Sequence, residues 1–191
     1  MTNVIALDIG RVCINLNYDD CAQLLGFSHI DDFFACKEIW AKNILMETGK
    51  ISANEFASQI QKVLPEKSQQ QIINAWQAII GKEIYGIREI VKLLATKNKI
   101  VFLSNTSQIH FTQIRNMLSF SSAIDQAVLS FEVGCMKPNL QIYQEFERQF
   151  GRPQLFIDDK EENILSAQQI HWPCYHMGNT EELRKIVDQL I

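Results

Sequence analysis

Short apolar runs of the kind that form buried strands recur along the sequence, and most of them precede a helical pattern. The runs predict strands at residues 4–7, 99–104, 127–130, 155–158 and, more weakly, 174–176. Between them, Ile and Leu recur every three or four residues, which predicts helices at residues 109–118, 140–150, 162–170 and 181–190. Strands that alternate with helices indicate an α/β fold whose parallel sheet is covered on both faces.

The stretch from residue 17 to residue 86 breaks this alternation, because it contains no clear strand pattern. It contains four helical patterns instead, at residues 19–25, 30–46, 52–63 and 68–80. We therefore predict an α/β core of residues 1–14 and 86–191, with a helical cap of residues 15–85 inserted after the first strand. An insertion at this point leaves from the carboxyl ends of the strands, where open α/β sheets bind ligands. It is therefore expected to act as a lid.

The composition narrows the class of protein. The chain has 191 residues, of which 47% are hydrophobic, so it can bury a sizeable core and is not disordered. Its net charge of −4 argues against nucleic acid as a partner. No apolar run approaches the roughly 20 residues of a membrane span, and the first residues lack the basic start of a signal peptide. The 5 scattered cysteines, without a C-x-x-C pair, favour reduced thiols and a cytoplasmic location.

The predicted strands end in polar residues that suit chemistry on a phosphoryl group. Asp8 follows the first strand and Ser104 ends the second. Lys137 lies a short loop beyond the third strand, and Asp158 and Asp159 follow one another at the end of the fourth. Clustered carboxylates repel one another unless a cation joins them, and oxygen ligands without His or thiolate favour a hard ion such as Mg²⁺. A lysine and a serine beside that ion can hold phosphoryl oxygens, while a free carboxylate attacks phosphorus to give an aspartyl-phosphate.

Four short motifs follow one another along the chain. They are Asp8-Ile-Gly-Arg-Val12, Leu103-Ser-Asn-Thr106, Ser130-x-x-x-Gly134-x-x-Lys137-Pro138 and Phe156-Ile-Asp-Asp-x-x-x-Asn163. In this order they resemble the four motifs of the haloacid dehalogenase (HAD) superfamily. The segment Glu47-x-Gly49-x-Ile51-Ser52 is similar to the helical cap of the branch with bacterial sugar-1-phosphate phosphatases and the N-terminal phosphatase domain of soluble epoxide hydrolase. The resemblance covers essentially the whole chain and implies a Rossmann-like three-layer α/β/α core with an inserted helical cap.

The resemblance also implies a role for each motif residue. Asp8 would be the nucleophile and a Mg²⁺ ligand, with the backbone carbonyl of Gly10 as a second ligand. Ser104 would hydrogen-bond the phosphoryl group, helped by the backbone of Asn105 at the start of a helix. Lys137 would neutralise Asp8 and the phosphate oxygens. The fourth motif would supply Asp159 as the main further Mg²⁺ ligand, with Asp158 and Asn163 in or beside the shell around the ligands.

The first motif departs from the usual pattern at Gly10. Phosphatases of the superfamily usually have a second Asp there, which protonates the leaving oxygen and then activates the hydrolytic water. Losing such a group typically costs about 10²–10⁴-fold in rate. Asp158, a cap side chain such as Glu47, or the substrate itself would have to compensate. Arg11 is also unusual, since an amide or a small residue is commoner there; it either adds positive charge near the phosphate or points to solvent.

These features lead to one principal hypothesis and two alternatives. The principal hypothesis is a Mg²⁺-dependent phosphatase that hydrolyses a small phosphorylated metabolite, such as a sugar phosphate, through an aspartyl-phosphate on Asp8. The second is haloalkanoate dehalogenation, which uses an Asp nucleophile but no metal, and which the pair Asp158–Asp159 disfavours. The third is a catalytically impaired module that binds a phosphometabolite or a protein partner through its cap, as the departure at Gly10 allows. Whether the chain is a monomer or a homodimer stays open.

The cap side chains are divided between packing and specificity. The aromatic residues at helical spacing are expected to form the core of the cap rather than a substrate box; they are Phe33, Phe34, Trp40 and Trp76. Substrate specificity is expected from cap residues that face the crevice, among them Trp40, Asn43 and Glu47. Cys13, close to the proposed nucleophile, is expected to be a small core residue.

Overall fold

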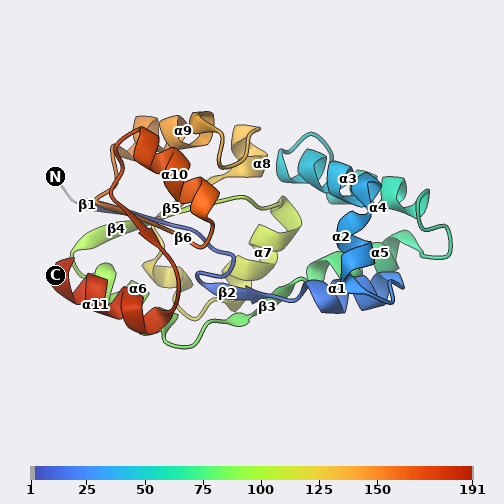
Figure 1. The fold of residues 1–191 in the computed structure, drawn as a ribbon, viewed down its shortest axis with the longest axis horizontal. Coiled ribbons are helices and arrows are strands. Elements are labelled where there is room, and N and C mark those ends of the chain that lie inside the picture. The colour runs from blue at the N-terminus through green and yellow to red at the C-terminus, as the bar shows by residue number, and fades with distance from the viewer. Residues whose placement is uncertain (1–2, 191) are drawn as a thin grey trace.

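The computed structural model describes residues 3–190 of the chain, and its centre is a five-stranded sheet with the order β5-β4-β1-β6-β7 (Figure 1). The strands are β1 (Asn3–Leu7), β4 (Asn98–Ser104), β5 (Gln126–Leu129), β6 (Leu155–Asp158) and β7 (Cys174–His176). Every pair of neighbouring strands is parallel. The predicted α/β fold with a parallel sheet is therefore confirmed, and all five strands lie where the apolar runs predicted them.

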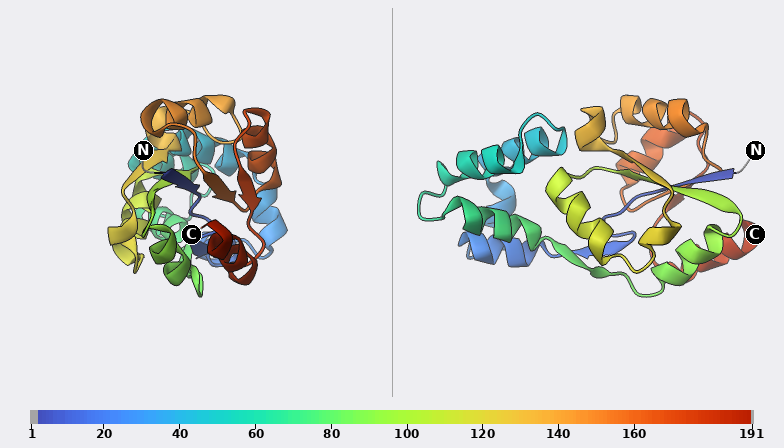
Figure 2. Two further views of the ribbon diagram at one scale, coloured as in Figure 1. Left: turned by 90° about the vertical axis from the view of Figure 1, so that its left-hand side faces the viewer. Right: turned by 180° about the vertical axis from the view of Figure 1, so that it is seen from behind.

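Helices cover both faces of this sheet, as the end-on view in Figure 2 shows. One face packs on α6 (Ile87–Leu94), α7 (Gln108–Met117) and α11 (Thr180–Leu190), and the other on α9 (Leu140–Phe150) and α10 (Glu161–Gln169). Successive side chains of a strand point to opposite faces. In β1, Ile5 and Leu7 accordingly belong to the first apolar cluster, whereas Val4 and Ala6 belong to the second.

Five helices form a separate group beyond the carboxyl ends of the strands (Figure 1). They are α1 (Tyr18–Leu25), α2 (Ile30–Ala35), α3 (Lys37–Glu47), α4 (Ala53–Gln61) and α5 (Gln69–Gln77). This α1–α5 segment has an apolar cluster of its own, with Phe33, Phe56 and Trp76 among its largest buried side chains. Two short antiparallel strands, β2 (Ile14–Leu16) and β3 (Ile80–Glu83), lead into and out of the segment.

The structure corrects several details of the sequence prediction. The stretch from residue 17 to residue 86 does contain a strand, β3, whose four residues are too few to show a period. The helix predicted at residues 30–46 is divided into α2 and α3, because the backbone of Cys36 leaves the helical region with ψ 85°. Helix α6 was not predicted, although its buried residues are spaced as in a helix. A short helix, α8 (Ser130–Val133), begins at the residue with which the third strand was predicted to end.

No helix in the described part of the chain combines the length and the apolar character that crossing a membrane requires. The described residues also contain a 3₁₀ turn, η1 (Ser121–Ala123), which leads into β5.

The loop after α3 lies against the core at Gly49. This residue has a positive φ of 67°, and a Cβ added to it would lie 2.1 Å from the carbonyl oxygen of Phe131 in α8. A Cβ cannot come this close to a backbone oxygen, so only glycine allows the contact as it stands. The contact joins the α1–α5 segment to the core beside Ser130.

We predict that Gly49→Ala destabilises the protein more than Gly26→Ala does. Gly26 also has a positive φ, of 94°, but an added Cβ there would meet only the flexible end of Lys67 at 3.5 Å. Both variants incur about 1–2 kcal/mol of backbone strain, and Gly49→Ala adds the cost of the clash, about 1–3 kcal/mol for overpacking. Urea unfolding of the two variants measures the difference. Equal losses of stability would mean that the loop moves away from α8 without cost.

Candidate active site

Three carboxylates meet at the carboxyl edge of the sheet. Asp8 directly follows β1, and its backbone N–H donates to the carbonyl oxygen of Ile157 in β6 at 2.9 Å. Asp158 is the last residue of β6, and Asp159 comes next in the chain. Each of the three can place one oxygen within 4.8 Å of an oxygen of the others. Because β1 lies between β4 and β6, these carboxylates occupy the centre of the edge.

The ammonium group of Lys137 lies between two of these carboxylates. Its Nζ is 2.7 Å from Oδ1 of Asp8 and 2.5 Å from Oδ2 of Asp158, and it also donates to the carbonyl oxygen of Leu103 at 2.7 Å. Lys137 and Asp8 are only 4% and 7% exposed, and Asp158 is fully buried. An ammonium group this deeply buried is stable only with such partners, since an unpaired buried charge is strongly destabilising.

Asn105 holds the loop that carries Lys137. Its side-chain amide donates to the carbonyl oxygen of Lys137, and its Oδ1 accepts from the backbone N–H of Lys137, both at 2.8 Å. Nearby, the hydroxyl of Ser130 donates to the carbonyl oxygen of Thr106 and accepts from the backbone N–H of the same residue. The second and third motifs are therefore joined to each other by side-chain to backbone hydrogen bonds.

These contacts alter the expectation for Asn105. The sequence predicted that its backbone lies at the start of a helix, but α7 begins three residues later, with Ser107 at the N-cap position. Ser104 is the last residue of β4 and is 2% exposed, so it lies beside Asp8 at the sheet edge as predicted. The reciprocal bonds of Asn105 to Lys137 connect residues that lie far apart in the chain, and no local pattern indicates them.

Asp158 and Asp159 are adjacent in the chain but differ in their surroundings. Oδ1 of Asp158 accepts from the backbone N–H of Lys160 and from the side-chain amide of Asn163, both at 2.9 Å, while its Oδ2 accepts from Lys137. Both oxygens of Asp158 are thus engaged within the protein. Asp159 is partly exposed and lines a cavity at the sheet edge. Of the two, Asp159 has the carboxylate that is open to a ligand.

Burial and mutual repulsion alter the protonation of these groups. Burial is the main cause that raises the pKa of Asp8 to about 6; Lys137 opposes the rise, and the nearby Asp158 adds to it. Burial, followed by repulsion from Asp158, also raises the pKa of Asp159. Burial alone would lower the pKa of Lys137, but the carboxylates of Asp158 and Asp8 outweigh it and raise that pKa above its usual value. The ammonium group is therefore charged at neutral pH.

A cavity of about 390 Å³ opens above the carboxylates, between the sheet edge and the α1–α5 segment. Its floor includes Asp8, Ser104 and Lys137, the residues that the motifs predicted. Other predicted residues also line it, namely Gly10, Arg11, Asn105, Asp159 and Asn163, whereas Asp158 lies behind the wall. Arg11 is exposed at the cavity, and its charge offsets a small part of the rise in the pKa of the neighbouring Asp159.

The α1–α5 segment contributes Tyr18, Phe34, Trp40 and Glu47 to this cavity. The prediction that the four aromatic residues are all core is therefore wrong for Phe34, which is 47% exposed. Phe33 and Trp76 are buried in the cluster, and Trp40 is partly buried, packs against the cluster and also lines the cavity. Tyr18 was not predicted, because a single aromatic residue at a helix start carries no signal in the sequence.

Glu47 ends α3 and faces the cavity from the side opposite the sheet. Burial raises the pKa of Glu47, while a hydrogen bond from the Asn43 side chain and the charge of Lys160 act in the opposite direction. The charge of Glu47 also contributes, after burial, to raising the pKa of Tyr18 to about 12. The cavity therefore has a third carboxyl group besides those of Asp8 and Asp159, and it stands apart from the cluster on the sheet.

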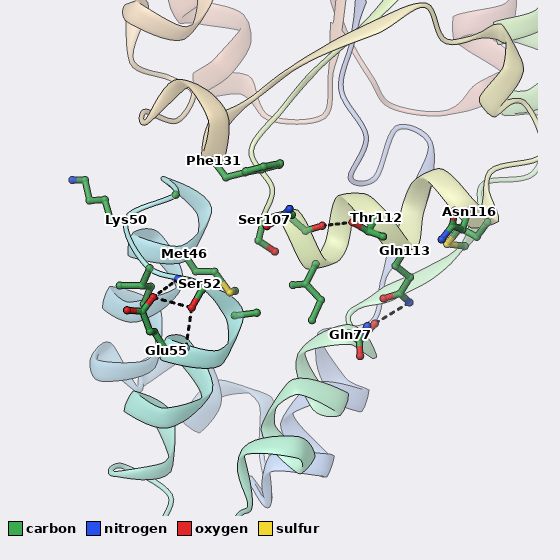
Figure 3. Close-up of a pocket in the computed structure, with 16 residues that line it drawn as sticks. Met46, Lys50, Ser52, Glu55, Gln77, Ser107, Thr112, Gln113, Asn116 and Phe131 are labelled. Atoms are coloured by element: carbon green, nitrogen blue, oxygen red, sulfur yellow. Dashed lines mark hydrogen bonds between the residues drawn. The ribbon is translucent and has the colours of Figure 1, made fainter.

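A larger cleft lies outside this site. It has a volume of about 980 Å³ and is bounded by α7, Phe131 and the loop around Ser52, as Figure 3 shows. None of the three clustered carboxylates lines it, and neither does Lys137. The end of α3 and the loop that follows it border both spaces, because Glu47 lines the smaller cavity and Met46 and Gly49 line the cleft. Because Asp8, Lys137 and Asp159 line the smaller cavity, that cavity is the candidate active site.

Comparisons with known proteins agree with this geometry. The sequence matches no family model and no curated protein. The structure is similar to a HAD family enzyme from Bacteroides thetaiotaomicron, with a TM-score of 0.85 and 25% identity over 97% of this chain and 98% of that one. A second crystal structure of that enzyme, in complex with magnesium and inorganic phosphate, has a TM-score of 0.78 and 26% identity over 93% of this chain and 95% of that one.

A predicted HAD-like family hydrolase from Porphyromonas gingivalis is also similar, with a TM-score of 0.79 and 23% identity over 100% of this chain and 98% of that one. These neighbours, and the motifs at the sheet edge, show that the chain has the fold of the HAD-like hydrolases. The resemblance drawn from the sequence is thereby confirmed at the level of the superfamily. The branch of sugar-phosphate phosphatases and the cap boundaries at residues 15–85 stay predictions.

We predict that Asp8→Asn stabilises the metal-free protein at pH 8 relative to the wild type, by up to about 3 kcal/mol. The fold raises the pKa of Asp8 from 3.8 to about 6, so ionised Asp8 opposes folding above that range. Asparagine removes this charge. The gain should shrink as the pH falls through 6 and vanish below about 4, where Asp8 is protonated in both the folded and the unfolded state.

Urea unfolding in the presence of a chelator, at a series of pH values, measures this effect. Asp188→Asn is the matched control, because Asp188 is exposed and pairs only with Arg184 on the surface of α11. A loss of stability in Asp8→Asn at pH 8 would contradict the prediction and would mean that the ion pair with Lys137 outweighs burial and repulsion.

Proposed function

We propose that this protein is a Mg²⁺-dependent phosphatase that hydrolyses a small phosphorylated metabolite through an aspartyl-phosphate on Asp8. The observation that carries the proposal is the buried cluster of Asp8, Asp158 and Lys137 under a cavity that Ser104 and Asp159 also line. The similar enzyme from Bacteroides thetaiotaomicron, which was crystallised with magnesium and inorganic phosphate, supports it. Sugar phosphates are the substrate class that the motifs favour.

The donor set fits Mg²⁺. Three carboxylates against one ammonium group leave a formal charge of −2, which a divalent cation would balance. Asp8 and Asp159 would hold the ion with the backbone carbonyl of Gly10, since Asp158 uses both of its oxygens within the protein. Oxygen ligands of this kind suit a hard cation. The bound ion would supply positive charge that offsets the charge of the phosphoryl oxygens.

The protein's own groups would bind and attack the phosphoryl group. Ser104 would donate to a phosphoryl oxygen, the positive charge of Lys137 would offset the charge of the phosphoryl group, and Arg11 would add positive charge at the entrance. A carboxylate oxygen of Asp8 would form a bond to phosphorus while the bond from phosphorus to the leaving oxygen breaks. Water would then attack phosphorus, release phosphate and restore the Asp8 carboxylate. Lys137 would remain bound to Asp158 throughout, which keeps its ammonium group in place.

Glu47 is the group best placed to supply the missing acid–base chemistry. Gly10 has no side chain for it, and Asp158 is fully buried with both oxygens engaged. Glu47 lines the same cavity as Asp8, from the opposite side, and burial favours its protonated form. Its carboxyl would give a proton to the leaving oxygen in the first step, and its carboxylate would take one from water in the second.

The alternatives have weaker support. An L-2-haloacid dehalogenase from Xanthobacter autotrophicus, in a structure with chloropropionic acid covalently bound, has a TM-score of 0.66 but only 11% identity, which shows a shared fold alone. The catalytically impaired module rests on Gly10, and the presence of Glu47 in the cavity weakens that argument. A cytoplasmic location remains part of the proposal, in keeping with the free state of all five cysteines.

Release of phosphate from a panel of sugar and polyol phosphates tests the proposed function. Wild-type protein should turn over at least one ester with Mg²⁺ and none with a chelator, and Asp8→Asn should be inactive. Glu47→Gln should lower kcat by about 10²–10⁴-fold and remove the alkaline limb of the pH profile, where Glu47 would lose its proton, with a smaller effect on KM. Glu55→Gln is the matched control, since Glu55 caps α4 and does not line the site. Full activity in Asp8→Asn would refute the proposal.

Gly10→Asp offers an independent test of the acid–base argument. A Cβ at this position would lie 3.2 Å from Cδ1 of Leu16, a side-chain end that can adjust, and the backbone of Gly10 does not require glycine. The new carboxyl would stand two residues after the nucleophile. We expect the double variant Gly10→Asp, Glu47→Gln to be at least about tenfold more active than Glu47→Gln alone, as general acid–base catalysis of the usual size would allow. No gain in the double variant would argue against this account of Glu47.

A further inference from the structure

Two buried polar atoms of the α1–α5 segment, on the side of the catalytic cavity above Asp8, lack partners. They are Oδ1 of Asn43 in α3 and Nε1 of Trp76 in α5, and neither has a hydrogen-bond partner among the described residues. The two side chains are only 6% and 2% exposed. Buried polar groups in native proteins are nearly always hydrogen-bonded, so each such atom requires an explanation.

Neither side chain is loosely held. The amide of Asn43 hydrogen-bonds Glu47, which leaves its carbonyl oxygen as the open acceptor. His110 of α7 hydrogen-bonds the carbonyl oxygen of Trp76 at 2.8 Å, and the ring of Phe56 packs against the indole with centroids 4.7 Å apart. The neighbouring Trp40 differs, because its Nε1 donates to the carbonyl oxygen of Phe33. Trp76 is thus fixed with its N–H group unused.

Asn43 and Trp76 line one small cavity of about 70 Å³. Trp40, Glu47 and Ser104 line this cavity and also the catalytic cavity, which is the cavity of about 390 Å³ above Asp8. At roughly 30 Å³ for each water of the liquid, the small cavity has room for about two waters, or for the hydroxyl-bearing end of a short carbon chain that extends from the catalytic cavity. The outer cleft of Figure 3 does not include Asn43 or Trp76 among its lining residues.

We propose that Asn43 and Trp76 form a subsite that binds the hydroxyl groups of a small polyol, so that the substrates are phosphate monoesters of polyols of about three carbons. One hydroxyl would donate to Oδ1 of Asn43, and one would accept from Nε1 of Trp76. An acceptor and a donor together match hydroxyl groups, which do both. A carboxylate would meet only one suitable partner, and an aliphatic chain would leave both atoms unpaired.

The role of this subsite in the reaction rests on the proposed function, whereas the chemistry of the group that it binds is inferred from the unpaired atoms. With the phosphoryl group beside Asp8 and Ser104, the leaving group would extend past Glu47 into the small cavity. Since the side chain of Asn43 also hydrogen-bonds Glu47, Asn43 would both bind the substrate hydroxyl and position Glu47, the proposed proton donor. A site built to bind a substrate hydroxyl rejects an analogue without it, because its polar groups are then left unpaired.

The indole N–H resonances test this subsite without any need for turnover. The chain has 3 tryptophans, so ¹⁵N-labelled metal-free protein should give three indole signals, each assigned by its Trp→Phe variant. Glycerol 3-phosphate should shift the Trp76 signal, whereas propyl phosphate and inorganic phosphate should not. The signal of Trp172 should not move, since its Nε1 donates to Glu147 on the far side of the sheet. Equal shifts with all three ligands, or none, would overturn the proposal and leave a cavity filled by water only.

Steady-state kinetics with Mg²⁺ provide the second measurement. Wild-type kcat/KM should be at least about tenfold higher for glycerol 3-phosphate than for propyl phosphate, the size expected from one good hydrogen bond. Trp76→Phe and Asn43→Leu should each reduce this ratio, while Trp172→Phe, the matched control, should leave it at the wild-type value. A ratio unchanged in Trp76→Phe would refute the subsite. If neither ester releases phosphate while another ester of the panel does, the polyol subsite fails and the proposed function stands. If no ester of the panel releases phosphate, the proposed function fails, and the resonance shifts alone decide whether polyol phosphates bind.

Discussion

The structure of the site depends on one buried ammonium group. Lys137 is almost fully enclosed and is held by Asp8, Asp158 and the carbonyl oxygen of Leu103. Removing these charges from water is costly, so the arrangement persists only because several elements supply partners at once. β1, β4 and β6 each contribute one partner from their carboxyl ends, and Asn105 fixes the backbone of Lys137 itself. The geometry of the loop, the sheet edge and the carboxylates is therefore a single unit.

Within this unit, the adjacent carboxylates of Asp158 and Asp159 have different partners. Asp158 is used entirely within the protein, by Lys137, by the backbone of Lys160 and by Asn163. Asp159 and Asp8 remain open to the cavity and carry the charge that a divalent cation would balance. The α1–α5 segment then adds what the sheet edge lacks. Glu47, at the end of α3, places a carboxyl group on the wall of the cavity opposite the sheet, and Gly49 allows the loop after α3 to contact α8.

The fold was largely predictable because its signals are local. The five strands of the sheet and the helices α7, α9, α10 and α11 carry continuous apolar runs or three- and four-residue spacing, and they lie where these patterns predicted them. Helix α6, with eight residues, was missed although its buried residues have helical spacing, and the other errors fall on short elements. β3 and α8 have four residues each, and the break at Cys36 interrupts an apolar spacing that continues across it. In such segments tertiary contacts, rather than local periodicity, decide the backbone.

The sequence by itself determined the class of fold and which polar residues gather at the sheet edge, because strand ends in a parallel sheet must converge and Asp8, Ser104, Asp158 and Asp159 all lie there. Only the tertiary structure decided which residues face one another across the cavity. It pairs Asn105 with Lys137 and brings Glu47 to the site, although these residues are far apart in the chain from their partners. It also places Asn43 and Trp76 side by side with an unpaired polar atom each. Hydrogen bonding and burial at such places depend on packing between elements, which no local spacing of residues specifies.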